Sequence, residues 1–263
     1  MPGILRDLFE SIRKPARREI FFRSLRTNRR ILFWYARKLV LPESRVEPLD
    51  RLHTVNQLRK DGRPVTLICN HLTYADSHII ETLLMRSGFQ DLASHIIHIA
   101  GQKTFDFTRR IFTRSLNTIR VYQPKARIDK QVKRKMNSRA LKWAAHLKRR
   151  GYIVLVFPEG TRTRRHQRFN PDAANPKSTI YFRHSSVVPL GLMGAEKIMP
   201  VGRILQSAAA VTLKIGEPID HDSLEQSIRM QNPEVTDQDL RRQLMAHYMQ
   251  KIGELLPPDY QPV

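Results

Sequence analysis

The stretch Tyr152-Ile153-Val154-Leu155-Val156-Phe157-Pro158-Glu159-Gly160-Thr161-Arg162-Thr163-Arg164 begins as a strand and ends as a basic turn. Its first six residues form a continuous apolar run rich in β-branched side chains, which is typical of a buried strand. Pro158 and Gly160 then end the strand. Arg162 and Arg164 alternate, so they point the same way in an extended chain, and their forked guanidinium groups suit phosphate oxygens. The other interpretation is a solvated basic turn, which composition alone favours.

Similar apolar runs recur along the chain, and helical stretches separate most of them. Such alternation predicts an α/β fold with a layered sheet. Ligands of open α/β sheets bind at the carboxyl ends of the strands, where His71 follows one run and Glu159 and Gly160 follow another. The expected strands span residues 65–69, 96–100, 118–122, 152–157, 187–192 and 209–215, and the expected helices span 76–87, 103–115, 129–150 and about 236–256.

A histidine and an aspartate five residues apart follow the run at 65–69, in Asn70-His71-Leu72-Thr73-Tyr74-Ala75-Asp76. A neutral imidazole can take the proton of a hydroxyl, and a carboxylate on its other ring nitrogen fixes the tautomer and stabilises the imidazolium. We therefore predict that His71 is a general base and Asp76 its partner. A second interpretation is that Asp76 caps the helix that begins there. The two interpretations are compatible, because a carboxylate held at a helix start is well placed to orient an imidazole.

Other residues with catalytic or metal-binding potential fit structural roles better. Cys69 ends an apolar run, so we expect it to pack in the core and not to act as a nucleophile. His95 and His98 are spaced like a metal pair, but a spacing of three on a strand places them on opposite faces. We predict no metal site. Backbone N–H groups near Gly160 are candidates for stabilising an oxyanion.

The chain has 263 residues, a formal net charge of +22 and a pI of about 10.8. Its length predicts one catalytic domain with helical additions, or at most two domains, and its single cysteine fits a reducing, cytosolic setting. We expect neither a membrane-spanning helix nor a signal peptide. The charge favours polyanionic partners, such as an anionic membrane surface, an acidic carrier protein or nucleic acid. Nucleic acid is not expected, since no helix-turn-helix, zinc or aromatic RNA-recognition motif is present.

Two segments carry the excess charge: residues 1–41 hold 11 Lys and Arg against 3 acids, and residues 103–150 hold 16 against 2. The first segment predicts an amphipathic helix, beginning near Pro15, that either lies in a membrane interface or packs on the domain. The second predicts a helix from Asp129 to about Arg150. The apolar face of the first helix comprises Phe21, Leu25, Leu32, Tyr35 and Leu39; that of the second comprises Val132, Met136, Ala140, Trp143 and Leu147, opposite Lys130, Lys133, Arg134 and Lys148.

The His71 and Arg162 motifs, in this order, resemble those of the glycerolipid acyltransferase family, which includes glycerol-3-phosphate and 1-acylglycerol-3-phosphate (lysophosphatidate) acyltransferases. The first family motif is N-H-x-S-x-x-D, matched at residues 70–76 with Thr for Ser, and the third is F-P-E-G-T-R-S, matched through Arg162. The apolar segment 187–192, with its proline, is similar to the fourth. The second motif is matched only by the turn at 101–103 and the strand at 118–122, without the usual Gly and Pro residues.

A further likeness is to the soluble, plastid-type glycerol-3-phosphate acyltransferases. Their phosphate clamp has a lysine shortly after a Val-Tyr strand end and two arginines after the third-motif glycine. Lys125, Arg162 and Arg164 match these residues, whereas Ala126 stands where a histidine is expected. The whole resemblance spans roughly residues 65–217.

The resemblance implies a layered α/β/α fold with a mostly parallel, mixed sheet and added N-terminal helices. It implies an O-acyltransferase of phospholipid synthesis that uses acyl-CoA or an acyl carrier protein thioester as co-substrate, without a cofactor, and acylates glycerol-3-phosphate or lysophosphatidate. We expect a basic helical region at 1–60, a catalytic domain at 61–220 and a helical tail at 221–263, with the protein cytoplasmic and peripheral on the inner face of the membrane. The predicted catalytic residues are His71 and Asp76, and the predicted substrate-binding residues are Lys125, Glu159, Gly160, Thr161, Arg162 and Arg164.

Overall fold

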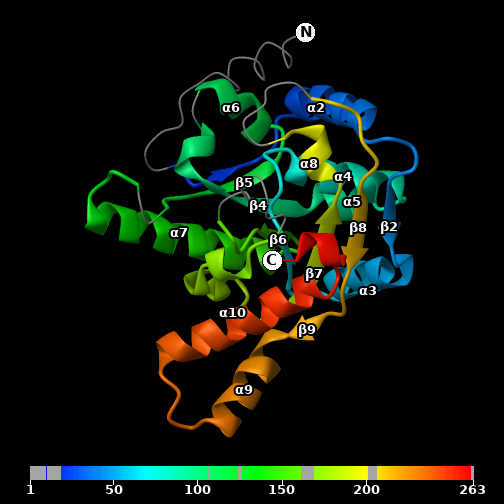
Figure 1. Ribbon diagram of the computed structural model, residues 1–263. Coiled ribbons are helices and arrows are strands. Elements are labelled where there is room, and N and C mark those ends of the chain that lie inside the picture. The colour runs from blue at the N-terminus through cyan, green and yellow to red at the C-terminus, as the bar shows by residue number, and fades with distance from the viewer. Residues whose placement is uncertain are drawn as a thin grey trace.

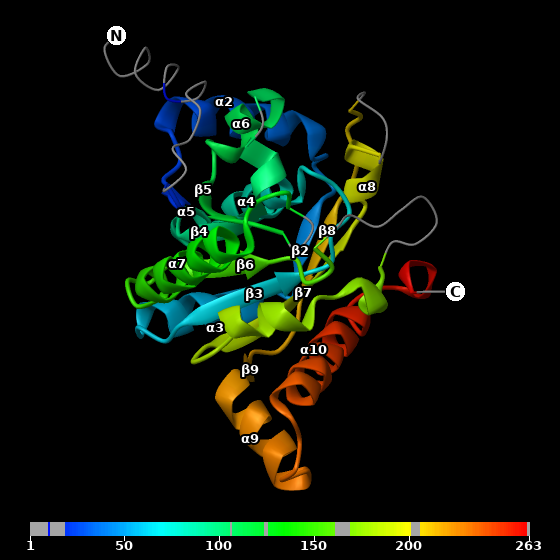
Figure 2. The same ribbon diagram turned by 90° about the vertical axis from the view of Figure 1, so that its left-hand side faces the viewer.

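The computed structural model describes residue 10 and residues 19–105, 107–123, 126–160, 169–200 and 206–261, with backbone alone at 107–109. A mixed sheet runs through this part of the chain, with helices on both of its faces (Figures 1 and 2). The strands are β1 (Phe21–Phe22), β2 (Arg45–Glu47), β3 (Val65–Cys69), β4 (Ile96–Gly101), β5 (Asn117–Val121), β6 (Ile153–Val156), β7 (Ser186–Met193), β8 (Thr212–Ile215) and β9 (Ile219–Asp220).

The strand order is β1-β5-β4-β6-β3-β7-β8-β2, and β9 pairs with β7. The five strands from β5 to β7 are mutually parallel, and β2 is parallel to β8, whereas β1, β8 and β9 pair antiparallel with their neighbours in the body of the sheet. All residues of β3 and β6 are buried, as expected for continuous apolar strands covered on both faces. The predicted α/β fold with a mostly parallel, mixed sheet is confirmed.

The handedness of the connections explains the two helical layers. The chain moves from β3 to β4 in one direction along the sheet and from β5 to β6 in the other, and right-handed crossovers therefore place α4 and α7 on opposite faces. Helix α2 packs with α4, whereas η3 packs with α7 and α10. The helices are α2 (Arg26–Leu39), α3 (Leu49–Lys60), α4 (Asp76–Arg86), α5 (Gln90–Ser94), η1 (Gln102–Phe105), α6 (Phe107–Thr113), α7 (Lys130–Lys148), η2 (Pro171–Ala173), η3 (Pro176–Tyr181), α8 (Ala195–Ile198), α9 (His221–Gln231), α10 (Asp237–Gly253) and η4 (Pro258–Tyr260).

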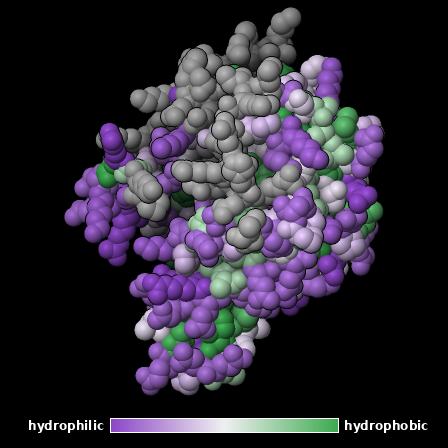
Figure 3. Space-filling view, in the orientation of Figure 1, coloured by the Kyte–Doolittle hydropathy of each residue, from purple (hydrophilic) through white to green (hydrophobic). Residues whose placement is uncertain are grey.

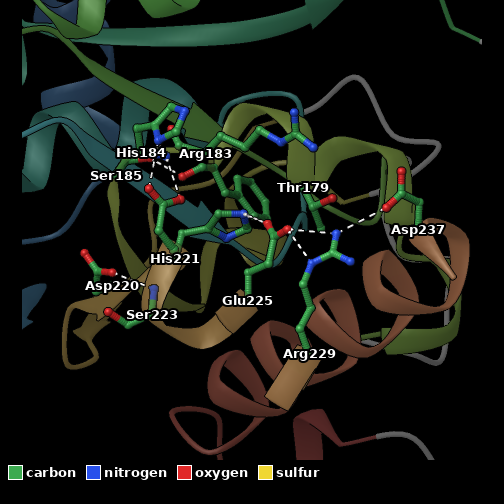
Figure 4. A network of polar contacts seen from close by, with 12 residues as sticks. Thr179, Arg183, His184, Ser185, Asp220, His221, Ser223, Glu225, Arg229 and Asp237 are labelled. Carbon is green, nitrogen blue, oxygen red and sulfur yellow. Dashed lines mark hydrogen bonds and ion pairs between the residues drawn. The ribbon is translucent and has the colours of Figure 1, made fainter. Parts of the chain in front are cut away.

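Polar contacts fasten the C-terminal helices to the start of β7 (Figure 4). The Nδ1 atom of His184 lies 2.8 Å from Asp222 Oδ2, and the buried His221 ring bonds the Tyr248 hydroxyl at 2.8 Å. Arg229 joins α9 to the start of α10 through Asp237. These contacts link segments on both sides of β9.

The N-terminal region is less uniformly helical than expected. Strands β1 and β2 both join the sheet. Phe21, predicted on the face of an amphipathic helix, lies in β1 instead, because its backbone pairs with β5 opposite Ile119. The helix begins only at Arg26, and Pro15 lies outside the described residues.

Helix α7 forms as predicted, capped by Asp129, whose side chain accepts a hydrogen bond from Val132 N. Two residues of its predicted apolar stripe are substantially exposed, Val132 at 42% and Trp143 at 38%. Trp143 stacks on Phe21 at the edge of the sheet. The prediction that Lys148 lies on the outer face is wrong: it is buried, and its Nζ donates to the Tyr181 and Arg183 carbonyls and to Ser185 Oγ.

No helix in the described part of the chain combines the length and the apolar character that crossing a bilayer requires.

Candidate active site

The loop between β3 and α4 carries His71 and is fixed at both ends. Asn70, fully buried, holds the strand end to β7: its Nδ2 donates to Leu192 O at 2.9 Å, and its Oδ1 accepts from Leu192 N at 2.8 Å. At the other end, Asp76 is the first residue of α4. The loop therefore lies at the carboxyl end of a central strand, where ligands of open α/β sheets bind.

The Asp76 carboxylate organises this loop. It is fully buried and accepts hydrogen bonds from Leu72 N at 2.7 Å, from Thr73 N at 3.0 Å and from the Thr73 hydroxyl at 2.9 Å. Its Oδ2 also lies 2.8 Å from His71 Nδ1. Asp76 thus binds the turn before the helix as well as the imidazole. The interpretation of Asp76 as the helix cap is wrong, because Ala75 is the N-cap residue of α4 and makes no side-chain capping bond. Thr73 supplies the hydroxyl that the family pattern takes from serine.

The contact with Asp76 sets the tautomer of His71. A carboxylate can only accept, so Nδ1 carries the proton and Nε2 is left as the basic nitrogen. The ring also stacks on Phe157, with centroids 4.5 Å apart and an interplanar angle of 25°. The His71 side chain is 17% exposed and lines a cavity. This arrangement is suited to removing a proton from a bound hydroxyl.

Glu159 joins the second motif to the first. It follows β6, is only 3% exposed, and its Oε1 accepts a hydrogen bond from His71 N at 3.0 Å. Burial raises the pKa of Glu159 to about 8, against the opposing effect of that hydrogen bond. The sequence predicted that Glu159 binds substrate. In the structure its side chain contacts the backbone N–H of His71, the proposed base. Sequence alone gave no sign of this contact, which spans 88 positions.

Gly160 lines the same cavity with a positive φ of +64°, a conformation in which a side chain would be strained. Its N–H donates to Phe157 O at 3.0 Å. That N–H group is therefore engaged within the turn, which weighs against the predicted oxyanion role for this particular group.

Lys125, Thr161, Arg162 and Arg164 lie outside the described residues. Their described neighbours do reach the cavity: Gln123 precedes the lysine segment, Gly160 precedes the arginine segment, and both line the same cavity as His71. Gln123 and Gly160 are the last described residues before the two predicted cationic segments.

The cavity has a volume of about 570 Å³ and extends from His71 under α2. Leu32, Tyr35 and Leu39, three residues of the predicted amphipathic face, line it. The apolar face of α2 thus packs over the site, as in the second of the two interpretations. The sequence did not predict that this helix would form part of the cavity wall, because the contact depends on how α2 packs on α4.

Two further groups of residues bear on the chemistry. Cys69 is fully buried and is a free thiol, and burial raises its pKa well above the usual value. It packs in the core, as predicted. His95 contacts Asp91 at the surface, whereas the buried His98 contacts Glu81. Within the described ranges, no group of three or more His, Cys, Asp or Glu side chains is placed to hold a metal ion.

Comparison with known proteins agrees with this site. The profile of the family described as Acyltransferase matches residues 46–193, more than half of the chain. This chain belongs to the Acyltransferase family. The matched segment runs from β2 to β7 and includes His71, Asp76 and Glu159.

Curated relatives of this Acyltransferase family member include glycerol-3-phosphate acyltransferases of chloroplasts. That of Phaseolus vulgaris is 35% identical over 111 residues, which cover 40% of this chain and 24% of the relative. ATS12 of Cucurbita moschata is 34% identical over 137 residues, covering 49% of this chain and 29% of the relative. The aligned segments thus span less than a third of these relatives. The resemblance to glycerolipid acyltransferases predicted from the motifs is confirmed.

A solved structure shares the fold over most of both chains. The crystal structure of PlsC, the 1-acyl-sn-glycerophosphate (LPA) acyltransferase of Thermotoga maritima, superposes with a TM-score of 0.52 and covers 95% of this chain and 87% of its own. Sequence identity is 19%, so this likeness supports the fold alone.

Proposed function

We propose that this protein is an O-acyltransferase that moves a fatty acyl group from an acyl thioester to the hydroxyl of glycerol-3-phosphate or lysophosphatidate. The observation that carries the proposal is the Asp76–His71 pair, 2.8 Å apart, beside a cavity that His71 lines together with Gln123 and Gly160. The names of the curated relatives support the acceptor class.

The proposed reaction needs no nucleophile from the protein. The acceptor oxygen attacks the thioester carbonyl carbon while its proton passes to His71 Nε2, and the carbon–sulfur bond then breaks. The thiolate leaves and takes the proton from the imidazolium, so an ester and a free thiol are formed. A positioned base contributes roughly 10²–10⁴-fold, and Asp76 stabilises the transient imidazolium. Acyl-CoA or an acyl carrier protein supplies the thioester, and no further cofactor enters.

The predicted phosphate-binding residues complete the proposal. Lys125, Arg162 and Arg164 would bind the acceptor phosphate, since guanidinium forks match phosphate oxygens. Gly160 and Thr161, which precede the arginines in the sequence, would bind the same substrate. Fixing the phosphate there would hold the acceptor hydroxyl near His71.

We also propose that the α2–α6 end of the molecule rests on an anionic membrane surface, in keeping with a peripheral cytoplasmic location. Exposed apolar side chains gather there: Ile31 is 58% and Trp34 60% exposed on α2, and Ile111 and Phe112 are each 42% exposed on α6. The two helices pack together at one end of the molecule in both ribbon views (Figures 1 and 2). Basic residues, Arg26, Arg30, Arg37 and Lys38, are exposed on α2 around this surface, a pattern typical of interfacial helices.

The test of the enzyme is an acceptor panel. Purified protein is supplied with labelled acyl-CoA or acyl carrier protein and with glycerol-3-phosphate, lysophosphatidate or glycerol. We expect a labelled ester with a phosphorylated acceptor, little with glycerol, and none above background with His71→Ala. Arg162→Ala should raise the acceptor KM more than it affects the donor KM. Transfer that persists in His71→Ala would remove the assigned base.

A further inference from the structure

A second histidine–carboxylate pair lines the same cavity as His71. His98, in the middle of β4, is 4% exposed, and its Nε2 lies 2.7 Å from Glu81 Oε1. The other carboxylate oxygen of Glu81 lies 2.5 Å from Arg29 Nη2, and Glu81 is fully buried. A carboxylate can only accept a hydrogen bond, so in the Glu81–His98 contact the proton lies on Nε2.

In the neutral ring this leaves His98 Nδ1 as a lone-pair acceptor. The atom is buried and has no hydrogen-bond partner among the described residues, and His98 is one of the residues that line the cavity. Buried polar atoms in proteins are nearly always paired, and leaving one unpaired is costly. A ligand that brings an O–H group to Nδ1 would supply the missing donor.

Three polar residues on the cavity wall, His78, Thr113 and Thr118, have paired side chains. His78 Nε2 bonds Ser115 Oγ at 2.7 Å, and burial lowers the pKa of His78 to about 3, so its ring is neutral. The Thr113 hydroxyl donates to Thr104 O at 2.6 Å, and the Thr118 hydroxyl donates to Thr113 O at 3.1 Å. The Nδ1 atom of His98 differs from these three groups in having no partner among the described residues.

The position of His98 separates it from the predicted phosphate side of the cavity. Asp76 and Glu81, the carboxylates that contact the two histidines, are five residues apart on α4, or about 7–8 Å along its axis. Gln123 packs against Gly101. Gly101 follows His98 by three residues on β4, which corresponds to about 10 Å along the strand. The nearby wall is formed largely by apolar residues, among them Leu32, Ile79 and Leu116. Such a wall suits the acyl chain of the donor, not the phosphate of the acceptor.

Building on the proposed function, we infer that His98 is a specificity residue for a hydroxyl on the acyl chain, and that the donors of this enzyme are hydroxylated acyl thioesters. With the thioester carbon beside His71, the chain passes along α4 to His98, several carbon atoms farther on. The chain hydroxyl donates to Nδ1, while Glu81 and Arg29 hold the ring in the required tautomer.

Wild-type protein provides the first test. Matched acyl-CoA donors of one chain length carry no hydroxyl, a hydroxyl at C3, or a hydroxyl at successive positions farther along, with a fixed acceptor. We expect one hydroxylated isomer to exceed the plain donor in kcat/KM by about tenfold or more, because the plain chain leaves Nδ1 unpaired. Equal values for every isomer and the plain donor would overturn the inference and would indicate that water occupies the position.

The second test uses His98→Phe, which keeps an aromatic ring and removes both nitrogens. The expected result is loss of the hydroxyl preference, whereas His95→Phe, the same change outside the cavity, keeps it. Equal losses for plain and hydroxylated donors, or a change confined to the acceptor KM, would show that His98 has only a structural or acceptor-side role.

Calorimetry separates this inference from the proposed function. The same donors are titrated into wild-type protein without acceptor. Tighter binding of a hydroxylated donor without any transfer would contradict the proposed reaction and still support the His98 subsite. Acyl transfer with equal binding and equal rates for plain and hydroxylated donors would support the proposed reaction and contradict the His98 subsite.

Discussion

His71 is held by two carboxyl groups of different character. Asp76 sits among donors, namely the His71 ring, two backbone N–H groups and the Thr73 hydroxyl. Glu159 is buried with the His71 N–H as a donor, and its pKa is raised to about 8. One group therefore acts as a charged partner of the ring, and the other is a largely neutral support of the backbone near pH 7.

The raised pKa of Glu159 predicts a pH-dependent stability. Between about pH 4.5 and pH 8 the native protein keeps a proton that the unfolded chain releases, so the free energy of unfolding falls as pH rises through this window. In Glu159→Gln the side chain is neutral in both the native and the unfolded protein, so the variant does not lose this part of its stability as pH rises. The unfolding free energy of the variant relative to wild type should therefore rise with pH, by an amount on the order of a few kcal/mol, and level off above about pH 8.

Urea denaturation at about pH 5, pH 6.5 and pH 8.5 measures this difference, with the exposed Glu234→Gln as control. A constant difference between Glu159→Gln and wild type across the series would mean that Glu159 is ionised in the native protein.

For single residues, the sequence predicted the contacts between side chains that are close together along the chain. Five positions between His71 and Asp76 place the carboxylate at a helix start, next to a ring on the preceding turn, and this contact forms as expected. The Glu159 contact and the His98–Glu81 pair depend on which strands are neighbours. His98 was considered only with His95, since sequence shows spacing along one strand and not the helix that covers it.

Among the elements, the strands of the parallel core were the most predictable, because burial on both faces leaves a continuous apolar run. The start of helix α2 was harder to predict from the sequence. Phe21 and Leu25 continue the helical pattern of α2, yet pairing with β5 draws Phe21 and Phe22 into a strand. Tertiary pairing here overrides a local pattern. The same holds for α7, where Val132 and Trp143 extend the apolar stripe but stay partly exposed.

Lys148 connects α7 to the segment before β7 through hydrogen bonds, and a substitution there tests this connection. Burial lowers the pKa of Lys148 to about 8, and its ammonium group donates to Tyr181 O at 2.9 Å, Arg183 O at 3.2 Å and Ser185 Oγ at 3.1 Å. Lys148→Met should destabilise the protein by about 1–3 kcal/mol, because buried acceptors lose their donor. Chemical denaturation near pH 7 measures the loss, with Lys142→Met, an exposed change on the same helix, as control. Equal stability of the two variants would contradict this role.

For the whole molecule, the net charge of +22 fits a largely hydrophilic surface, as the face in Figure 3 shows for the described residues. Figure 3 shows an apolar area at the lower end of this face, and exposed apolar residues of α2 and α6 gather at the opposite end. Leu32, Tyr35 and Leu39 of α2 line the cavity beside them. A membrane at this end would therefore lie next to the site that is proposed to bind acyl chains.

The membrane proposal predicts a loss of liposome binding in a surface variant. Deleting the N-terminal region is a poor test, because Phe22 and Phe33 belong to the core. In the double variant Ile31→Ser, Trp34→Ser the fold should remain intact, and partition onto anionic liposomes should fall by about tenfold or more, since each apolar side chain contributes on the order of 1 kcal/mol or more when buried. Met230→Ser, on the exposed surface of α9 at the opposite end, is the control. Equal flotation of both variants would place the membrane contact elsewhere.

The central claim is that the base at His71 and the cations at Lys125, Arg162 and Arg164 act on one bound acceptor. A crystal structure of the wild-type protein with glycerol-3-phosphate and no acyl donor tests it most directly. The claim predicts a hydroxyl oxygen within about 3.2 Å of His71 Nε2, with the phosphate against the arginines. An acceptor bound with its phosphate on those arginines and every hydroxyl beyond reach of His71, or bound away from the cavity, would contradict it.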